Sequence, residues 1–267
     1  MIQKISNRFL ILIFLCLVVS GLAKTLSQTL AGSEGTIEPR ILIDKPTAGM
    51  MKRGSFSFGI DFFQFGGVLT SLNAGINDKL SFGISYGGNN IISSQNVEWN
   101  KSPGVNIKFR LLDEQNGFPA VSLGFDSQGK EDYLKNFERY RVKSLGFYAV
   151  GSKNIEFLGY LSIHGGINRS LENKDSDNNV NAFLGFEKTL GIEASFVGEY
   201  DFATNDDNPP FVIAQTNRFN LGIRWNIGDG FMLGANLKAI GKRNNAFKIG
   251  NRTILVEYIK KIGRAHV

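Results

Sequence analysis

The sequence predicts an all-β chain that folds as an antiparallel up-and-down transmembrane β-barrel of about 12 strands, within a range of roughly 10 to 14. Three observations favour this fold. Segment after segment alternates apolar residues with small or polar ones, which is the period of a β-strand. Short turns alternate with longer polar loops, as they do in membrane barrels. The composition, with 22 Phe and 31 Gly but only 4 Met in 267 residues, favours strands over helices.

The amino terminus has the pattern of a cleaved secretory signal peptide over residues 1–23. Lys4 and Arg8 precede an apolar run from Phe9 to Val19, and small residues follow it. The alternative, an uncleaved anchor, needs about 20 apolar residues, and this run is shorter. Without residues 1–23 the net charge falls from +6 to +4, because 28 basic residues then face 24 acidic ones. This small excess, with no base-stacking motif, argues against nucleic acid as a partner.

Residues 24–53 show no period and contain Pro39 and Pro46, which predicts a periplasmic N-terminal extension that leads into the first strand. The barrel is predicted over residues 54–261. Its expected strands are 54–65, 68–76, 80–87, 104–113, 119–126, 142–153, 158–167, 180–189, 191–201, 218–227, 231–240 and 252–260. Longer outer loops are expected around 88–103, 127–141, 168–179, 202–217 and 241–251. Both ends of the barrel then lie on the periplasmic side, and only Gly66-Gly67 makes a short connection where an outer loop is due.

The two faces of each predicted strand differ in a way that indicates their surroundings. The strand at 104–113 places Ile107, Phe109 and Leu111 on one face, and Lys108 and Arg110 on the other. In the strand at 80–87 the second face carries only Ser and Gly. A water-facing surface is normally more highly charged than this. We therefore expect the Phe/Leu/Ile face to contact the lipid of a bacterial outer membrane, with a soluble secreted β-protein as the alternative.

Eight charged residues are predicted to line the lumen. They are Lys108, Arg110, Glu187, Glu193, Glu199, Asp201, Arg224 and Lys238. Two uses compete for them: an internal network of ion pairs that holds the barrel together, or a charged lining that selects solutes.

The sequence predicts no catalytic, cofactor-binding or metal-binding residues, and therefore no enzyme. His164 is the only histidine apart from His266, which argues against a multi-histidine metal site. Ser162 shares its strand face, but residues two apart on a strand are about 7 Å apart, too far for a serine–histidine hydrogen bond. The Asp/Asn-rich loops at 173–179 and 205–208 lack the calcium-loop spacing and are predicted to be solvated.

Part of the chain resembles the YjbH-like outer-membrane proteins. The residues concerned run from Ser102 to Glu114, through Phe118-Pro119-Ala120 and Gly124-Phe125-Asp126, and from Gly146 to Lys153. The resemblance is to a basic strand with an acidic turn, a Pro-Ala strand and a later strand that ends in Ser-Lys. It implies a role in exopolysaccharide production or secretion, with polysaccharide or periplasmic secretion components as partners. The chain is much shorter than the long members of that family.

The last residues, 262–267, match the translation of a sequencing-adapter oligonucleotide and are predicted to be an artefact, with an ordinary polar tail as the alternative. The sequence as a whole thus predicts a non-enzymatic outer-membrane barrel with a role in exopolysaccharide production or secretion. A general solute porin, a structural membrane anchor and, less favoured, a barrel-embedded lipid hydrolase are the alternatives.

Overall fold

The computed structural model describes residues 39–191, 193–206, 218–243 and 246–262. The predicted signal peptide at 1–23 lies outside these residues, as does the predicted artefact at 262–267 apart from its first residue. The regular structure that is described consists of strands and one 3-10 helix, η1 (Lys135–Phe137). Within the described ranges no helix is long and apolar enough to cross a membrane.

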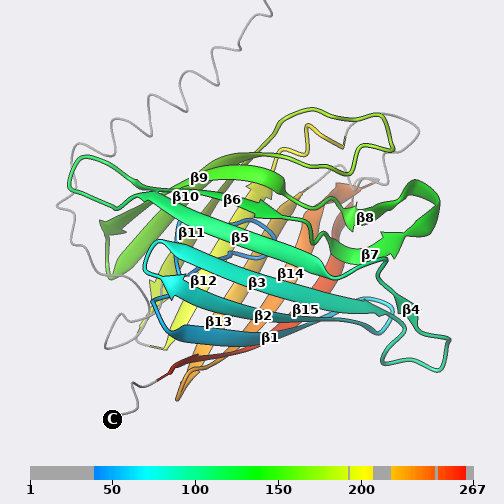
Figure 1. Ribbon diagram of the computed structural model, residues 1–267, viewed down its shortest axis with the longest axis horizontal. Coiled ribbons are helices and arrows are strands. Elements are labelled where there is room, and N and C mark those ends of the chain that lie inside the picture. The colour runs from blue at the N-terminus through cyan, green and yellow to red at the C-terminus, as the bar shows by residue number, and fades with distance from the viewer. Residues whose placement is uncertain (1–38, 192, 207–217, 244–245, 263–267) are drawn as a thin grey trace, which may run out of the picture.

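Antiparallel strands close into a ring in which each strand pairs with its neighbours along the chain (Figure 1). The twelve strands of the ring are β1 (Ser55–Phe63), β2 (Gly67–Asn77), β3 (Leu80–Asn89), β5 (Gly104–Leu112), β6 (Ala120–Asp126), β9 (Gly146–Glu156), β10 (Tyr160–Arg169), β11 (Asn181–Leu190), β12 (Ala194–Asp201), β13 (Phe219–Gly228), β14 (Phe231–Arg243) and β15 (Ala246–Lys261). The ring closes where β1 pairs with β15, with Ser55 opposite Lys261. The predicted up-and-down barrel of about twelve antiparallel strands is confirmed.

The two ends of the barrel differ in their connections. At one end, called the turn end, short turns join β2 to β3, β9 to β10, β11 to β12 and β13 to β14, and β1 begins beside the end of β15. The opposite loop end carries the longer connections. These contain β4 (Glu98–Trp99) and a separate hairpin of β7 (Lys130–Leu134) and β8 (Arg139–Val142), all at the same end of the barrel in Figure 1.

Two predicted loops contain more strand than their polar sequences indicate. The expected loop at 241–251 is an extension of the β14–β15 hairpin, in which backbone pairing continues to Arg243 opposite Ala246. The expected loop at 127–141 contains β7, and β8 pairs with β7 instead of starting the next barrel strand, so β9 begins at Gly146 rather than at 142. In both places pairing with a neighbouring segment overrides the weak strand preference of charged residues.

Gly66 explains the one short connection at the loop end. It has a φ of +63°, which side-chain-bearing residues rarely adopt, and a Cβ atom at this position would collide with the carbonyl group of Ile92. The turn between β1 and β2 can therefore be tight because Gly66 lets the loop that follows β3 pack directly over it.

The orientation of the strand faces agrees with the alternation in the sequence. On the outside, Phe58, Ile84 and Ile223 are 43%, 45% and 51% exposed, whereas Ser57 is fully buried and Ser81 nearly so. The apolar side chains thus point away from the lumen, and the hydroxyl, amide and charged side chains point into it.

The lumen is occupied by residues 39–51, which we call the plug. All residues from Leu42 to Met51 are buried, and their contacts are with inward-facing side chains of the strands. The sequence predicted a periplasmic extension for residues 24–53. Of its described part, residues 39–51 instead lie inside the barrel, because their buried backbone groups find hydrogen-bond partners on the polar inner wall, whereas Lys52 and Arg53 are exposed.

Candidate functional site: the plugged lumen

The plug folds back on itself in a tight turn. Ile41 and Pro46 form an isolated antiparallel bridge. The Leu42 N–H donates to the Lys45 carbonyl at 2.9 Å, and the Thr47 N–H donates to the Arg40 carbonyl at 3.2 Å. A segment this short has too little apolar surface to fold alone. Its conformation therefore depends on the barrel wall.

Glu199 on β12 binds the tip of this turn. Its carboxylate accepts the backbone N–H groups of Ile43, Asp44 and Lys45 at 2.9–3.0 Å, together with the side-chain amide of Asn220 at 2.7 Å. Glu199 is 1% exposed. Successive backbone N–H groups in a turn form an anion-binding concavity. The plug tip is such a concavity, and a carboxylate from the wall fills it.

Ion pairs hold the side chains of the same turn. Lys45 pairs with Asp201 at 2.7 Å, and Asp44 pairs with Lys238 at 2.8 Å. Lys238 also pairs at 3.1 Å with Glu131, which belongs to β7 in the loop-end hairpin. One buried lysine therefore links the plug, the barrel wall and the hairpin that lies over the loop end.

Cations on the opposite wall bind the carbonyl groups of the plug. Lys108 Nζ donates to the carbonyls of Arg40, Thr47 and Gly49 at 2.8–3.2 Å. Arg110 Nε donates to the Ala48 carbonyl at 3.0 Å. Further along the ring, Arg224 donates to the Leu42 carbonyl, and Arg40 of the plug pairs with Glu257 of β15.

His164 has a serine partner, but not the one on its own strand. Its Nδ1 atom lies 2.7 Å from the Ser152 Oγ atom, because Ser152 is directly opposite on β9, whereas Ser162 donates to Asn154. Ser152 Oγ also accepts the Ala48 N–H at 2.8 Å. The pair is therefore covered by the plug and helps to bind it, which does not fit a serine nucleophile open to substrate.

The structure separates the eight predicted lumen residues into two groups. Those that contact the plug directly are Lys108, Arg110, Glu199, Asp201, Arg224 and Lys238. The other two lie nearer the turn end: Glu187 accepts a hydrogen bond from Ser195 at 2.6 Å, and Glu193 is exposed. The ion pairs of the first group thus run through the plug, a partner that the sequence pattern did not indicate.

A second charged cluster lies at the loop end. Arg139, 1% exposed, donates to Asp175 at 2.5 Å and to Asp206 at 2.7 Å, and Lys143 pairs with Asp175 at 2.7 Å. Burial opposes ionisation of Asp175, yet the hydrogen bond and charge of Lys143 and the charge of Arg139 hold its pKa below the usual range. The prediction that these Asp/Asn loops are solvated is wrong for Asp175 and Asp206.

Glu172 lies beside this cluster in a different electrostatic setting. Its carboxylate accepts the backbone N–H groups of Tyr140 and Ser144 at 3.1 and 3.3 Å. Burial nevertheless raises the pKa of Glu172 to about 7, because desolvation outweighs these hydrogen bonds. The loop end therefore contains a carboxyl group that titrates near neutral pH.

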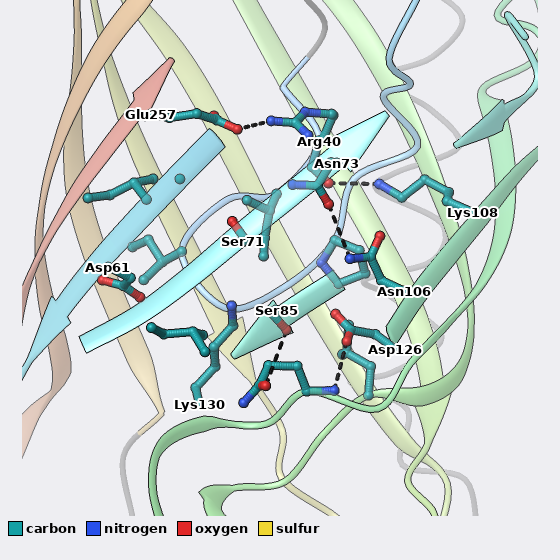
Figure 2. A pocket seen from close by; sticks show the side chains of 18 of the residues that line it. Arg40, Asp61, Ser71, Asn73, Ser85, Asn106, Lys108, Asp126, Lys130 and Glu257 are labelled. Carbon is teal, nitrogen blue, oxygen red and sulfur yellow. Dashed lines mark hydrogen bonds and ion pairs between the residues drawn. The ribbon is translucent and has the colours of Figure 1, made fainter. Parts of the chain in front are cut away.

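A cavity of about 150 Å³ separates the plug from β1, β2, β3, β5 and β6 (Figure 2). Its wall carries amide and hydroxyl groups, and Asn106 donates to Asn73 at 3.1 Å along this wall, over Gly83 of the strand between them. Figure 2 shows Arg40 bonded to Glu257 on one side of the cavity, and Asp61 and Lys130 without a marked contact on another. No group of three or more His, Cys, Asp or Glu residues in the described chain is placed to hold a metal ion.

Comparison with known proteins adds little to this geometry. No family model and no curated protein matches the chain. Among solved structures the chain is similar to the NanC porin in a rhombohedral crystal form, at 7% sequence identity and a TM-score of 0.40, over 78% of this chain and 99% of that chain. The YjbH-like resemblance stays a prediction.

Proposed function

We propose that this chain is a non-enzymatic β-barrel of the bacterial outer membrane that forms a channel for small solutes, and that the plug closes this channel at rest. The observation that carries the proposal is the combination of an apolar outer face with a polar lumen whose charged side chains bind residues 39–51.

The outer face supports a membrane location. Phe58, Ile84 and Ile223, from widely separated strands, all point outward and are about half exposed, and similar side chains recur around the ring. Soluble monomers rarely expose apolar surface on this scale. Aromatic groups stand near both ends of this face: Tyr86 and Trp99 stack at 5.7 Å near the loop end, and Trp225 is exposed toward the turn end.

The chemistry of the lumen supports a channel. The plug is held by many hydrogen bonds and ion pairs, alongside two apolar clusters, one of Leu42 and Ile43 with Val197 and one that includes Ala48. Water and solutes can replace such polar bonds, whereas a lumen packed with apolar side chains would have no aqueous path without the plug. Release of the plug would leave a wall of Ser, Asn, Lys, Arg and Glu side chains.

Single-channel recording in planar bilayers tests the proposal. We expect the full chain to conduct only in rare openings. The Glu199→Gln variant removes the carboxylate that binds the plug tip, which should weaken plug binding by about 2 kcal/mol and raise the open fraction roughly thirty-fold. Glu156→Gln, an exposed carboxylate at the turn end, is the matched control and should behave like the parent.

Two results would overturn the proposal. One is a Glu199→Gln barrel that folds but conducts no more often than the parent. The other is a full chain that conducts steadily with the plug in place, as shown by protection of a Thr47→Cys thiol from a maleimide reagent. This cysteine would be the only one in the chain apart from Cys16, which lies within the predicted signal peptide.

The exopolysaccharide role implied by the YjbH-like resemblance is a separate proposal. With the plug in place, a cavity of about 150 Å³ cannot pass a polymer of sugars. Deletion of the gene should then reduce surface polysaccharide. Restoration by the parent chain, but not by a variant whose plug is held permanently in the lumen, would favour that role over solute transport.

A further inference from the structure

The cavity in Figure 2 is lined by one carboxyl and one amino side chain, Asp61 and Lys130, that form no hydrogen bond or ion pair with a residue that the structure describes. Among the residues that the structure describes, Asp61 of β1 has no ion-pair partner, and its Oδ1 atom is buried without a hydrogen-bond partner. Lys130 of β7 lines the same cavity, and no ion pair joins the two residues or ties Lys130 to another described residue. Partly buried charges in proteins are normally paired or bind a ligand.

The other charged groups around the cavity already have partners. Arg40 pairs with Glu257, Lys108 donates to three plug carbonyls, and Arg224 donates to Leu42 and to Asn236. Asp126 accepts the Gln128 N–H at 2.8 Å. Asp61 and Lys130 therefore remain as the charged side chains of this cavity that no hydrogen bond or ion pair with a described residue occupies.

We propose that this cavity binds a small zwitterionic solute, with its ammonium group on Asp61 and its carboxylate on Lys130. A purely cationic or purely anionic ligand would satisfy only one of the two residues. The amide groups of Asn73 and Asn106, with Ser71, offer hydrogen bonds to the body of the ligand. At 10–15 Å³ for each water-sized position, 150 Å³ has room for roughly ten such positions, which suits a solute of about ten non-hydrogen atoms.

The position of the cavity gives this binding a consequence. Ile43 and Met51 of the plug line it on one side, and Gln128 and Lys130 lie on the segment that enters the β7–β8 hairpin. A bound zwitterion would contact both the plug and the segment that enters the β7–β8 hairpin. The inference names the solute class of the channel proposed above and in that respect rests on it, although binding is measurable on a barrel that never conducts.

Isothermal titration calorimetry on the full chain folded in detergent tests the inference. The probes are L-glutamine, which has ten non-hydrogen atoms, and glycine; N-acetyl-L-glutamine lacks the ammonium group, and L-glutaminamide lacks the carboxylate. We expect the zwitterions to bind at least about tenfold more tightly than either blocked compound. Asp61→Asn should abolish the discrimination against N-acetyl-L-glutamine, and Lys130→Met the discrimination against L-glutaminamide. Glu156→Gln should change neither.

The inference fails if neither zwitterion binds, if the blocked compounds bind equally well, or if both variants fold and bind like the parent. If Asp61→Asn lowers thermal stability without changing the affinity for the zwitterions, Asp61 stabilises the barrel and does not bind the solute. That result also overturns the inference. Plug-dependent conductance without zwitterion binding would remove this inference and leave the proposed channel in place. Zwitterion binding together with a lack of conductance in every variant would remove the proposed channel and leave this inference in place.

Discussion

Individual carboxyl groups in this protein differ in what their burial achieves. Glu199 and Glu172 both accept backbone N–H groups, but Glu199 does so inside the plug turn and Glu172 at the loop end. The first holds a segment in the lumen. The second has a pKa of about 7, so its protonation changes in the range of pH that a bacterial surface meets.

Glu172 predicts how the loop end responds to pH. Burial raises the pKa of Glu172 from its ordinary value of 4.5 to about 7 in the folded loop. Between these two pH values the carboxyl group is therefore protonated in the folded loop and ionised in the unfolded loop. Packing of this loop is therefore strongest below that window and weakens as pH rises through it, by about 3 kcal/mol. Hydrogen-exchange protection of the Tyr140 and Ser144 amides, corrected for intrinsic rates, should fall between pH 5 and pH 8.

The Glu172→Gln variant is the control for this titration. Its amide stays neutral, so the protection of the same amides should no longer depend on pH. Equal pH dependence in parent and variant would assign the effect to another group.

At the scale of elements, the alternation along each strand predicts which side chains face inward, but not what they bind. Lys108 and Arg224 are on the polar faces of β5 and β13, and the bounds of both strands agree with the predicted ones to within a few residues. Both side chains bind carbonyl groups of the plug, which has no period, and the Leu42 carbonyl that Arg224 binds is 182 residues away along the chain. A backbone acceptor carries no side-chain signature, and this is why the plug was missed.

Lys238 couples three elements, and its removal should affect all of them. Lys238→Met would leave Asp44 of the plug buried without its cation, at a cost of about 3–5 kcal/mol, and would leave Glu131 of β7 with only the more distant Arg141 at 3.9 Å. Hydrogen–deuterium exchange followed by mass spectrometry should show faster exchange in both the plug and the β7–β8 hairpin. The β9–β10 hairpin, which Lys238 does not contact, should be unchanged.

A change confined to one of the two segments would show that Lys238 does not couple them. Adding Asp44→Asn to Lys238→Met should restore part of the lost protection in the plug, because the uncompensated carboxylate is then gone.

At the scale of the whole molecule, the belt of outward-facing apolar side chains determines where the barrel is stable. Ile84 lies in the middle of β3, pairs with Leu72 and Val105, and is 45% exposed. Ile84→Arg should lower the stability of the barrel in lipid vesicles by about 2–4 kcal/mol. The measurement is a urea titration in vesicles, followed by the mobility of the folded form in gel electrophoresis.

Ile92→Arg provides the comparison for the belt. Ile92 is 62% exposed but lies in the loop after β3, outside the strands of the ring. It should leave vesicle stability unchanged. If both variants are equally stable in vesicles, or if the parent stays soluble without detergent, the apolar face does not contact lipid.

The sequence predicted strand number and strand orientation well because both follow from local patterns of alternation and turn residues. It missed the β7–β8 hairpin and the continuation of β14 and β15 past their predicted ends. The Lys, Arg and Asn residues there are typical of loops, and they form strands because neighbouring segments pair with them. It also missed the partnership of His164 with Ser152, which depends on the register between two strands.

The pairing of β1 with β15 has a consequence for assembly. Every other contact around the ring joins segments that are near one another in sequence, whereas this seam brings Ser55 to Lys261. Such a non-local contact has the largest loop-closure entropy cost and tends to form late. The plug ends only a few residues before β1. Entry of the plug into the lumen and pairing of β1 with β15 therefore involve adjacent residues. We therefore expect the plug to become enclosed in the lumen when β1 pairs with β15.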